Sequence, residues 1–365
     1  MIFLKNEFLA MKSVNIFLLG FGGVGRALAR QIVEARERHK TRNQLALNIV
    51  GLVDSTSAMI DANGLSDESI TRAISAKTQT GRLPVDQTQP ASIITAFPTN
   101  AIVVDTTASA AAMPMVLAAL SAGGGYVTAN KLPVAGKLAW WDAISRSKAR
   151  WETTCGAALP VISTLNTLLD SGDEVHKIEG CLSGTLGYLS SELERGTPFG
   201  DAVRTAKQLG YTEPDPRQDL GGLDVARKAL ILARMLGYRL EMNDVQAESL
   251  YPASMDGLSM DEFLREVDTL NQLMAERAAS LMAGGKKLRY AATIEDGKLA
   301  VGLIGAAPDS KLGSTRASDS IVAFHTKYFN DNPLAVSGRG AGQEVTASGV
   351  LGDIVSLAKE ISVTD

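Results

Sequence analysis

The first half of the chain alternates between two hydrophobic patterns. Short apolar runs that favour β-strands recur in it, at 15–19, 47–54, 101–107 and 125–130. Between them apolar residues follow helical spacing, as at Val24, Leu28 and Ile32, and as over 111–124, which ends in glycines. Strands that alternate with helices favour a parallel sheet covered by helices on both faces. We therefore predict an α/β domain in this half.

The second half ends in a different pattern. Residues 287–305 contain two β-like runs around Asp296-Gly297, which is a hairpin signal. Residues 320–340 repeat the arrangement around the turn at 330–333. The two hairpins predict a second sheet, and thus an α+β domain. The pattern over 346–361 predicts a final helix that returns to the first domain.

Length, charge and cysteine content exclude several classes of protein. The chain has 365 residues, 45% of them hydrophobic, which suits two domains with a large core. A net charge of −4 without blocks of like charge argues against nucleic-acid binding, and no apolar run is long enough to span a bilayer. Cys155 and Cys181 make up neither a disulfide framework nor a zinc-ligand set. The N-terminal segment carries Glu7 and lacks a small-residue cleavage site, so we expect a cytoplasmic protein, with Met11 as an alternative start.

The first apolar run leads directly into the sequence GFGGVG at 20–25. Between a strand and a helix, Gly20 permits the tight turn, Gly22 lets a pyrophosphate approach the backbone, and Gly25 lets helix and strand pack closely. The helix N-terminus then offers free N–H groups to the phosphates. The predicted cofactor contacts of this turn are Gly20, Gly22, Gly23, Val24 and Gly25. The alternative is a glycine-rich turn that binds nothing.

Asp54 ends the second apolar run. A carboxylate there can accept hydrogen bonds from the adenosine ribose, and no arginine follows closely to hold a 2′-phosphate, which favours NAD. Asp54 lies further from the glycines than the usual ~20 residues. We expect the extra length, in the charged stretch 34–44, to extend the first helix and its loop. The alternative is a loop aspartate that binds nothing.

The stretch 210–238 contains most of the candidate catalytic and substrate-binding residues of the second half. Gly210 stops a helix, two prolines hold a rigid loop, and a helix follows from about Leu223 to Leu236. Asp224 and Lys228 are four residues apart and share one face of that helix. By pattern alone, an exposed ion pair worth a few tenths of a kcal/mol explains the two residues better than catalysis does.

The block GYTEPDPR at 210–217, continued by DLGGLDVARK at 219–228, resembles homoserine dehydrogenases. The similarity covers nearly the whole chain, through GFGGVG, VDTTAS (104–109), TANK (128–131), ETTCGAALPVI (152–162), GCLSGTLGYL (180–189) and GRGAGQEVTASGVLGDI (338–354). It implies a Rossmann-type NAD(P)-binding domain at 13–155, completed by the C-terminal helix at 346–365, and an α+β catalytic and dimerisation domain at 156–345. It also implies reversible reduction of L-aspartate 4-semialdehyde to L-homoserine with NADH or NADPH, for threonine, methionine and isoleucine biosynthesis, by a homodimer.

The resemblance further implies a role for individual residues. Lys228 matches the lysine that gives a proton to the carbonyl oxygen, and Lys131 matches a second active-site lysine between nicotinamide and substrate. Glu213 and Asp224 match acids that bind the amino end of the substrate. The further matches to cofactor-lining positions are Thr107, Lys131, Gly210 and Gly342. A monovalent cation, Na⁺ or K⁺, is implied at Glu152, Cys155, Ala157 and Leu159, the last three through backbone carbonyls.

Two other functions compete with this prediction. A phosphorylating semialdehyde dehydrogenase needs a thiolate nucleophile and a histidine base, and neither cysteine has a sequence context that suggests activation. A nucleotide sensor with a dead active site would not be expected to keep all four of the matched residues, which are Lys131, Glu213, Asp224 and Lys228. One departure from the family is Gln218, where an acid is common before Asp219. Glutamine can still hydrogen-bond, so we expect it to tune activity.

Overall fold

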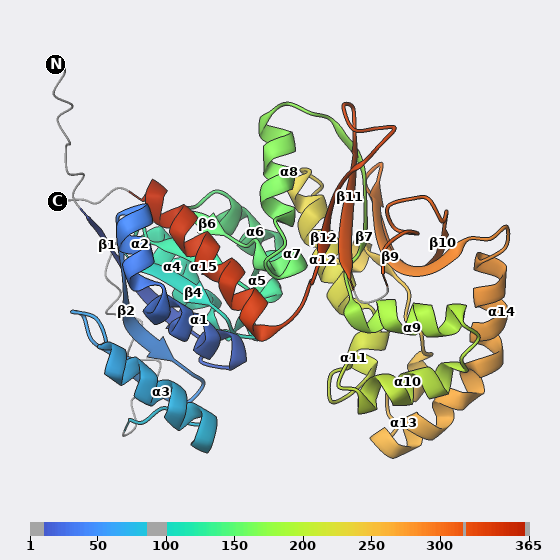
Figure 1. Ribbon diagram of the computed structural model, residues 1–365, viewed down its shortest axis with the longest axis horizontal. Helices are drawn as coiled ribbons and strands as arrows, with labels where there is room; N and C mark the ends of the chain where they lie inside the picture. Colours follow the sequence, from blue (N-terminus) through green and yellow to red (C-terminus); the bar gives the residue numbers. More distant parts are fainter. Residues whose placement is uncertain (1–10, 86–100, 317–318, 362–365) are drawn as a thin grey trace. The chain divides into compact units, whose positions relative to one another are not determined.

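A computed structural model describes residues 11–85, 101–316 and 319–361 and divides the chain into two compact units (Figure 1). The first unit comprises Met1–Val134, Ala139–Thr154 and Gly342–Asp365, and the second comprises Ala135–Leu138 and Cys155–Ala341. The short segment 135–138 is bound to the second unit by the Arg234 guanidinium, which donates to the Gly136 carbonyl at 2.7 Å. The chain therefore passes between the units several times.

The first unit is built on a six-stranded sheet in the order β3-β2-β1-β4-β5-β6. Its strands are β1 (Lys12–Leu19), β2 (Leu45–Val53), β3 (Ala58–Ile60), β4 (Ala101–Asp105), β5 (Gly125–Thr128) and β6 (Ala149–Arg150). Every neighbouring pair is parallel except β2 with β3. The strand order reverses direction between β1 and β4, and ligands of open α/β sheets bind outside the carboxyl ends of strands at such a point.

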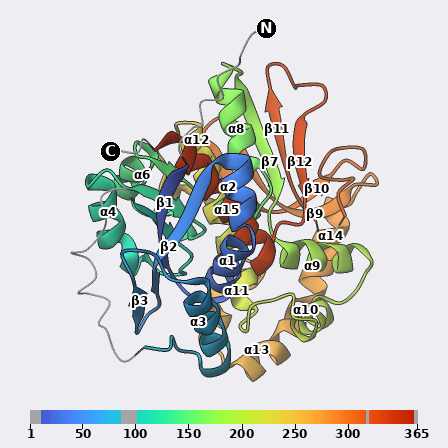
Figure 2. The ribbon, with the colours of Figure 1, turned by 60° about the vertical axis from the view of Figure 1, so that its left-hand side comes forward.

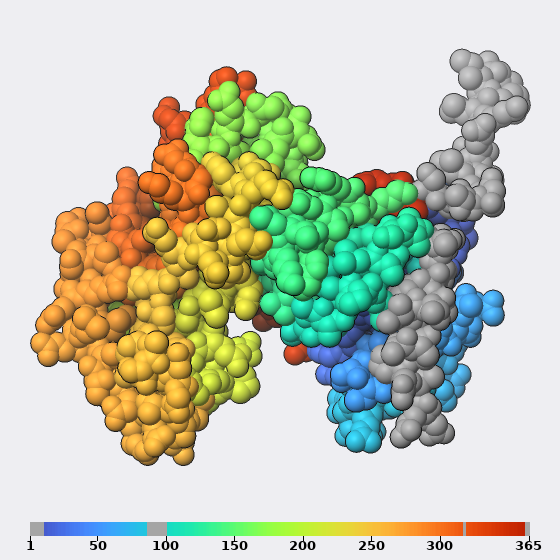
Figure 3. All heavy atoms as spheres, turned by 180° about the vertical axis from the view of Figure 1, so that it is seen from behind, coloured from blue at the N-terminus to red at the C-terminus, as the bar shows by residue number. Residues whose placement is uncertain are grey.

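Helices cover both faces of this sheet. They are α1 (Gly23–Glu34), α2 (Arg36–Asn43), α3 (Asp67–Thr80), the 3₁₀ turn η2 (Ala110–Ala112), α4 (Met113–Ser121), α5 (Lys131–Ala135), α6 (Leu138–Ser145), α7 (Thr153–Gly156) and α15 (Gln343–Glu360). Helices α1 and α15 lie side by side on one face, and Leu28 and Ile354 are fully buried in their shared core (Figures 1 and 2). The teal and green residues of α4 to α6 form the surface on the other side (Figure 3). The C-terminal helix thus completes the first unit.

Two local predictions for this unit need correction. The stretch 34–44 does not extend the first helix: α1 ends at Glu34, and a separate helix α2 begins at Arg36. Strands β4 and β5 stop two residues before their apolar runs end, at Asp105 and Thr128. One further backbone bond follows each strand: the Thr106 N–H donates to the Leu19 carbonyl at 2.8 Å, and the Ala129 N–H donates to the Asp105 carbonyl at 2.9 Å. The Thr106 hydroxyl donates to the Gly20 carbonyl at 2.6 Å.

The second unit contains a six-stranded sheet in the order β12-β11-β7-β9-β10-β8. Its strands are β7 (Val175–Cys181), β8 (Gln246–Ala247), β9 (Lys287–Glu295), β10 (Lys298–Ala306), β11 (Ser320–Thr326) and β12 (Leu334–Gly338). Neighbours are antiparallel except β10 with β8. Both predicted hairpins are confirmed, as β9–β10 around Asp296-Gly297 and as β11–β12.

Helices of the second unit pack against this sheet, with α9, α12 and α14 in contact with β9. The helices are α8 (Val161–Asp170), α9 (Gly184–Glu194), α10 (Phe199–Gln208), α11 (Arg217–Leu220), α12 (Leu223–Met235), α13 (Met260–Glu266) and α14 (Asn271–Leu281), with 3₁₀ turns η3 (Met242–Asp244), η4 (Ala253–Met255) and η5 (Val267–Leu270). The predicted fold class, an α/β unit with an α+β unit, is confirmed. Within the described ranges, none of the helices has the length and apolar character that a bilayer crossing requires.

Candidate active site

The turn between β1 and α1 contains glycines with two different physical roles. Gly20 has φ +87°, and a Cβ there would lie 2.7 Å from the Thr107 nitrogen. A Cβ on Gly25 would lie 2.1 Å from the Gly20 carbonyl oxygen. These two glycines are required by the packing of the protein itself. A Cβ on Gly22, by contrast, would meet no described atom within 4 Å.

Gly22 therefore faces open space at the start of α1. It is the N-cap residue of that helix, and among the described residues no side chain caps the first turn. The backbone N–H groups of such a turn can bind an anion. An exposed backbone next to unbonded N–H groups fits the pyrophosphate of a dinucleotide.

The start of α15 lies against the same turn. Gly342, with φ +122°, is the N-cap of α15, and the side chain of Gln343 comes within 2.4 Å of the position that a Gly23 Cβ would take. Gly23 is thus needed where the C-terminal helix approaches. The structure brings the predicted residues at 20–25 together with Gly342, although the two segments lie more than 300 residues apart in sequence.

Asp54 follows β2, and both of its carboxylate oxygens are already engaged. Oδ1 accepts bonds from the N–H groups of Thr56 and Ser57 at 2.8 and 2.7 Å, and from both hydroxyls. Oδ2 lies 2.7 Å from Lys77 Nζ, and the Asp54 side chain is only 5% exposed. A ribose hydroxyl would have to compete with these donors. The contact between Asp54 and ribose stays a prediction, and Lys77 is a partner that the sequence did not suggest.

The same contacts give Asp54 a pH-dependent role in stability. Burial raises the pKa of Asp54, but the bond from Lys77 and those from Thr56 and Ser57 outweigh it and lower the pKa from 3.8 to about 2. A carboxyl group with a lowered pKa stabilises the fold above its unfolded pKa, and this contribution is lost as the pH falls through the window from 3.8 to about 2.

We expect Asp54→Asn to destabilise the first unit by about 2 kcal/mol at pH 7, because the amide accepts fewer of these bonds and does not pair with Lys77. The difference from wild type should shrink as the pH is lowered through that window. Urea unfolding of both proteins at several pH values measures it. A difference that stays constant down to pH 2 would rule out the ionised carboxylate as its source.

The carboxyl ends of β4 and β5 carry two more predicted residues of the first unit. Thr107 follows β4, and its hydroxyl donates to the Asp105 carboxylate at 2.7 Å. Lys131 follows β5 as the first residue of α5. Asn130, just before it, donates from its side-chain amide to Thr107 Oγ1 at 3.1 Å. Asp105 and Asn130 were not predicted, although both stand in the motifs that carry the family resemblance.

The second unit places Lys228 on the first turns of α12. Its Nζ donates to the Leu182 carbonyl at 2.6 Å, beyond the end of β7, and lies 2.7 Å from Asp224 Oδ2. The Lys228 side chain is 10% exposed, whereas that of Asp224 is 45% exposed. The pair is thus no surface ion pair: a buried ammonium is held between a carbonyl and a carboxylate that reaches solvent.

Asp219 and Glu213 are bonded to each other in the segment before α12. Asp219 accepts from the Glu213 N–H at 2.8 Å and from the Thr185 hydroxyl at 3.0 Å. Burial raises the pKa of Asp219, and the charges of Glu213 and Asp224 raise it further. Gly210, with φ +71°, ends α10 as predicted. Asp219 and Thr185 therefore support the loop that carries Glu213.

The predicted cation ligands lie on one stretch that passes from the first unit to the second. Glu152 precedes α7, and its N–H donates to Asp353 at 2.9 Å. Ala157 has φ +52°, a conformation that is unusual for a residue with a side chain. Such strain is most often found at functional sites. Ala157 and Leu159 lie between α7 and α8, whereas Cys155 lies within α7, and the cation itself stays a prediction.

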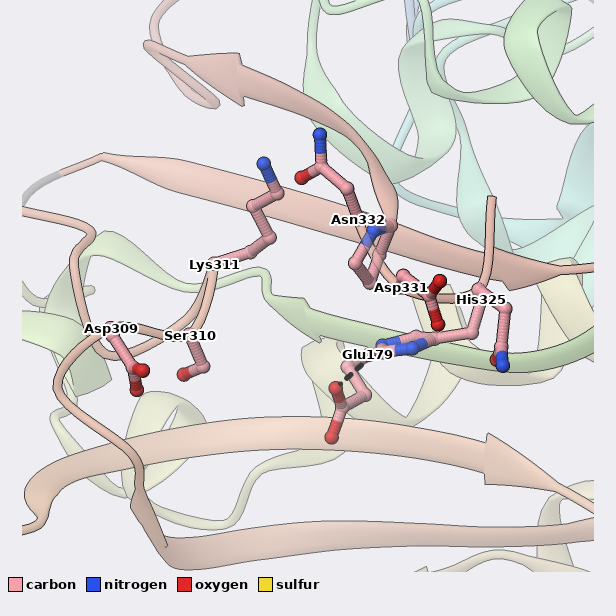
Figure 4. A pocket seen from close by; sticks show the side chains of 9 residues that line it. Glu179, Asp309, Ser310, Lys311, His325, Asp331 and Asn332 are labelled. Carbon is pink, nitrogen blue, oxygen red and sulfur yellow. Dashed lines mark hydrogen bonds and ion pairs between the residues drawn. The ribbon is translucent and has the colours of Figure 1, made fainter. Parts of the chain in front are cut away.

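A separate pocket of the second unit, of about 360 Å³, is lined by none of the predicted residues. In it His325 Nε2 lies 2.9 Å from Glu179 Oε2, between the strands β7 and β11 (Figure 4). Carboxylates, a lysine and asparagines line it together, and no one ligand chemistry follows from that mixture. The predicted residues instead lie at the glycine turn, after β2, β4 and β5 and at the start of α15 in the first unit, on residues 210–228 of the second, and on the stretch 152–159.

Comparison with known proteins points to one family. Residues 20–155 match the family model described as "Homoserine dehydrogenase, NAD binding domain", and residues 160–355 match the model described as "Homoserine dehydrogenase". The homoserine dehydrogenase of Saccharomyces cerevisiae is 33% identical, with 97% of this chain and 100% of that protein covered. The bifunctional aspartokinase/homoserine dehydrogenase of Haemophilus influenzae is 36% identical over 94% of this chain. The chain spans 43% of the length of that relative.

Solved structures share the fold. A Candida auris protein of unknown function superposes with a TM-score of 0.84 at 32% identity, covering 96% of this chain and 99% of that one. A hyperthermophilic archaeal homoserine dehydrogenase in complex with NADPH gives a TM-score of 0.74 at 24% identity, covering 96% and 99%. At that identity the second likeness supports the fold alone.

Proposed function

The chain belongs to the homoserine dehydrogenase family, and we propose that it reduces L-aspartate 4-semialdehyde to L-homoserine with NAD(P)H, reversibly, in the cytoplasm. The observation that carries the proposal is the buried Lys228 ammonium, held by Asp224 and the Leu182 carbonyl. Reduction of a carbonyl builds negative charge on oxygen, and a fixed ammonium meets that charge and can donate the proton.

The residues of the first unit fit a bound dinucleotide. Gly22 leaves open the space that a pyrophosphate would take, and Thr107 and Lys131 stand at the carboxyl ends of neighbouring strands. NAD(P)H, when bound, supplies the hydride. Glu213 and Asp224 supply negative charge for the ammonium of the substrate, and Asp224 in addition holds Lys228.

One set of assays tests the proposal. NADH and NADPH consumption is followed with aspartate semialdehyde, and NAD⁺ or NADP⁺ reduction with homoserine. Activity in both directions without added phosphate is expected. Reduction of NAD(P)⁺ by the semialdehyde only in the presence of phosphate would favour the phosphorylating dehydrogenase. Burial raises the pKa of the Cys181 thiol to about 12, and Cys155 is 1% exposed, so neither thiol is poised as a nucleophile.

The pairing of Asp54 with Lys77 predicts the choice between NADH and NADPH. Asp54 directly follows β2, Lys77 of α3 lies beside it, and the two side chains carry opposite charges. If they face the adenosine ribose, Asp54→Ser removes the charge that repels a 2′-phosphate, and Lys77→Met removes the charge that offsets it. We expect the ratio of kcat/KM for NADPH to that for NADH to rise about tenfold in the first variant and to fall in the second. Unchanged ratios in both would place the ribose elsewhere.

The dimer and the cation complete the proposal. We propose a homodimer formed through the second unit, and a monovalent cation, Na⁺ or K⁺, at the loop of Glu152, Cys155, Ala157 and Leu159. Exchange of all Na⁺ and K⁺ for tetramethylammonium should lower kcat several-fold, because the large ion cannot replace a small one among backbone carbonyls. Recovery on addition of either small ion is the control. An unchanged rate at constant ionic strength would remove the cation from the proposal.

A further inference from the structure

Asp105 is a buried carboxylate at the carboxyl end of β4 that none of the roles above uses. It is 0% exposed. Oδ1 accepts from the Thr107 N–H at 2.9 Å and from the Thr107 hydroxyl at 2.7 Å. Oδ2 accepts from the Tyr126 hydroxyl and from the Asn130 side-chain amide, both at 3.1 Å. Four donors from three residues thus meet on one carboxylate.

The chemistry of these partners requires an acceptor at this position. A backbone N–H and a side-chain NH₂ can only donate. Burial raises the pKa of Asp105, and the bonds from Thr107, Asn130 and Tyr126 oppose that effect. The Asp105 carboxylate is therefore costly to bury, and its hydrogen bonds compensate that cost. An apolar residue in its place would leave these donors without an acceptor.

Asn130 carries the connection from Asp105 to Lys131. Its side-chain NH₂ also donates to the Ser109 carbonyl at 2.8 Å, and its Oδ1 accepts from the Leu132 N–H at 3.1 Å. Its own N–H donates to Thr128 Oγ1 at 2.9 Å. The backbone of Lys131 is thus held on both sides, since Asn130 and Leu132 are its two neighbours.

We propose that Asp105 is a positioning residue of the reaction, which sets Thr107 and the Asn130–Lys131 segment relative to one another. This rests on the proposed function, in which Thr107 lines the cofactor and Lys131 lies beside the reacting carbon. Thr107 after β4 and Asn130 after β5 must keep a constant relative position, and both are bonded to the Asp105 carboxylate. A displacement of 1 Å at a reacting centre can cost about 10²-fold in rate.

Asp105→Asn is the decisive variant, and Tyr126→Phe is its matched control. An asparagine presents an NH₂ group to at least one set of donors, so Thr107 or Asn130 must move away. Tyr126→Phe removes one buried hydrogen bond from the same carboxylate and leaves the other three in place. Both variants should lose thermal stability to a similar degree. We expect kcat to fall about tenfold or more in Asp105→Asn and to stay within about twofold in Tyr126→Phe.

Two further readouts separate positioning from general loosening of the fold. With deuterium at the transferred position of NADPH, the isotope effect on kcat should increase in Asp105→Asn and not in Tyr126→Phe. Asn130→Ala, which leaves Asp105 with Thr107 and Tyr126, should reproduce the kcat loss if Asp105→Asn does not fold. Equal kcat losses in Asp105→Asn and Tyr126→Phe, or an unchanged kcat in Asp105→Asn, would overturn the proposal.

The wild-type assay keeps this proposal distinct from the proposed function. If wild type does not reduce the semialdehyde, the proposed function fails, and NADPH binding followed by fluorescence still tests Asp105. The dissociation constant should then rise severalfold in Asp105→Asn and remain unchanged in Tyr126→Phe, because only the first variant breaks the bonded set of Thr107, Asn130 and the carboxylate. Equal dissociation constants in both variants would overturn the role of Asp105.

Discussion

We expect Lys228→Ala to lower kcat for semialdehyde reduction by about 10²-fold or more, the usual scale for a positioned acid. The side chain is nearly buried, and its ammonium has a fixed place between the Leu182 carbonyl and the Asp224 carboxylate. Removing it takes away both the proton and the charge that would meet the developing oxyanion. Binding of NADPH should change little, because the predicted role of Lys228 is to meet the oxygen of the substrate and it is not among the predicted cofactor contacts.

Two variants control for the loss of packing. Lys228→Met keeps most of the apolar stem and loses only the charge, so it should be as inactive as Lys228→Ala but more stable. Lys40→Ala removes a lysine from an exposed pair with Glu37 and should leave kcat unchanged. Steady-state kinetics with both nucleotides measures all three. A near-normal kcat in Lys228→Met would leave the lysine a structural role only.

Gly22→Val should raise the dissociation constant of NAD(P)H by about 10²-fold with the fold intact. No described atom lies within 4 Å of the added Cβ, so the protein itself has room for it. The branched side chain would instead occupy the space in which a pyrophosphate approaches the backbone. Fluorescence titration gives the affinity, and thermal unfolding gives the stability.

The neighbouring Gly25 offers the contrasting control. A Cβ there would stand 2.1 Å from the Gly20 carbonyl oxygen, so Gly25→Ala must move the strand–helix turn and should lower the unfolding temperature. The two variants separate a glycine needed by the ligand from a glycine needed by the fold. Normal NADPH affinity in Gly22→Val would refute the phosphate site at this turn.

The sequence by itself determined the elements and turns that depend on local backbone chemistry. The glycines at 20–25, the hairpin at Asp296-Gly297 and the helix stop at Gly210 all lie where the pattern predicted them. Gly20, Gly210 and Gly297 meet a local demand on φ, which is positive at all three, and glycine meets it at little cost. Gly25 meets a demand of close packing within the same turn. The family motifs likewise supplied the candidate functional residues, because a motif is a local string.

The partners of those residues could not be found in this way. Asp54 pairs with Lys77, Lys228 with the Leu182 carbonyl, and Asp105 with Asn130, across separations of 23, 46 and 25 residues. The neighbouring strands β4 and β5 bring Asp105 and Asn130 together, whereas Lys77 and Lys228 reach their partners from the helices α3 and α12. Strand order and helix packing are properties of the whole unit. The residue pattern therefore favoured a ribose-binding role for Asp54 and a surface pair for Lys228, whereas the family resemblance implied catalysis by Lys228. Only the tertiary structure showed that Asp54 already accepts bonds from Thr56, Ser57 and Lys77 and that the Lys228 side chain is nearly buried. Burial depends on what packs over a helix and not on the spacing of residues along it.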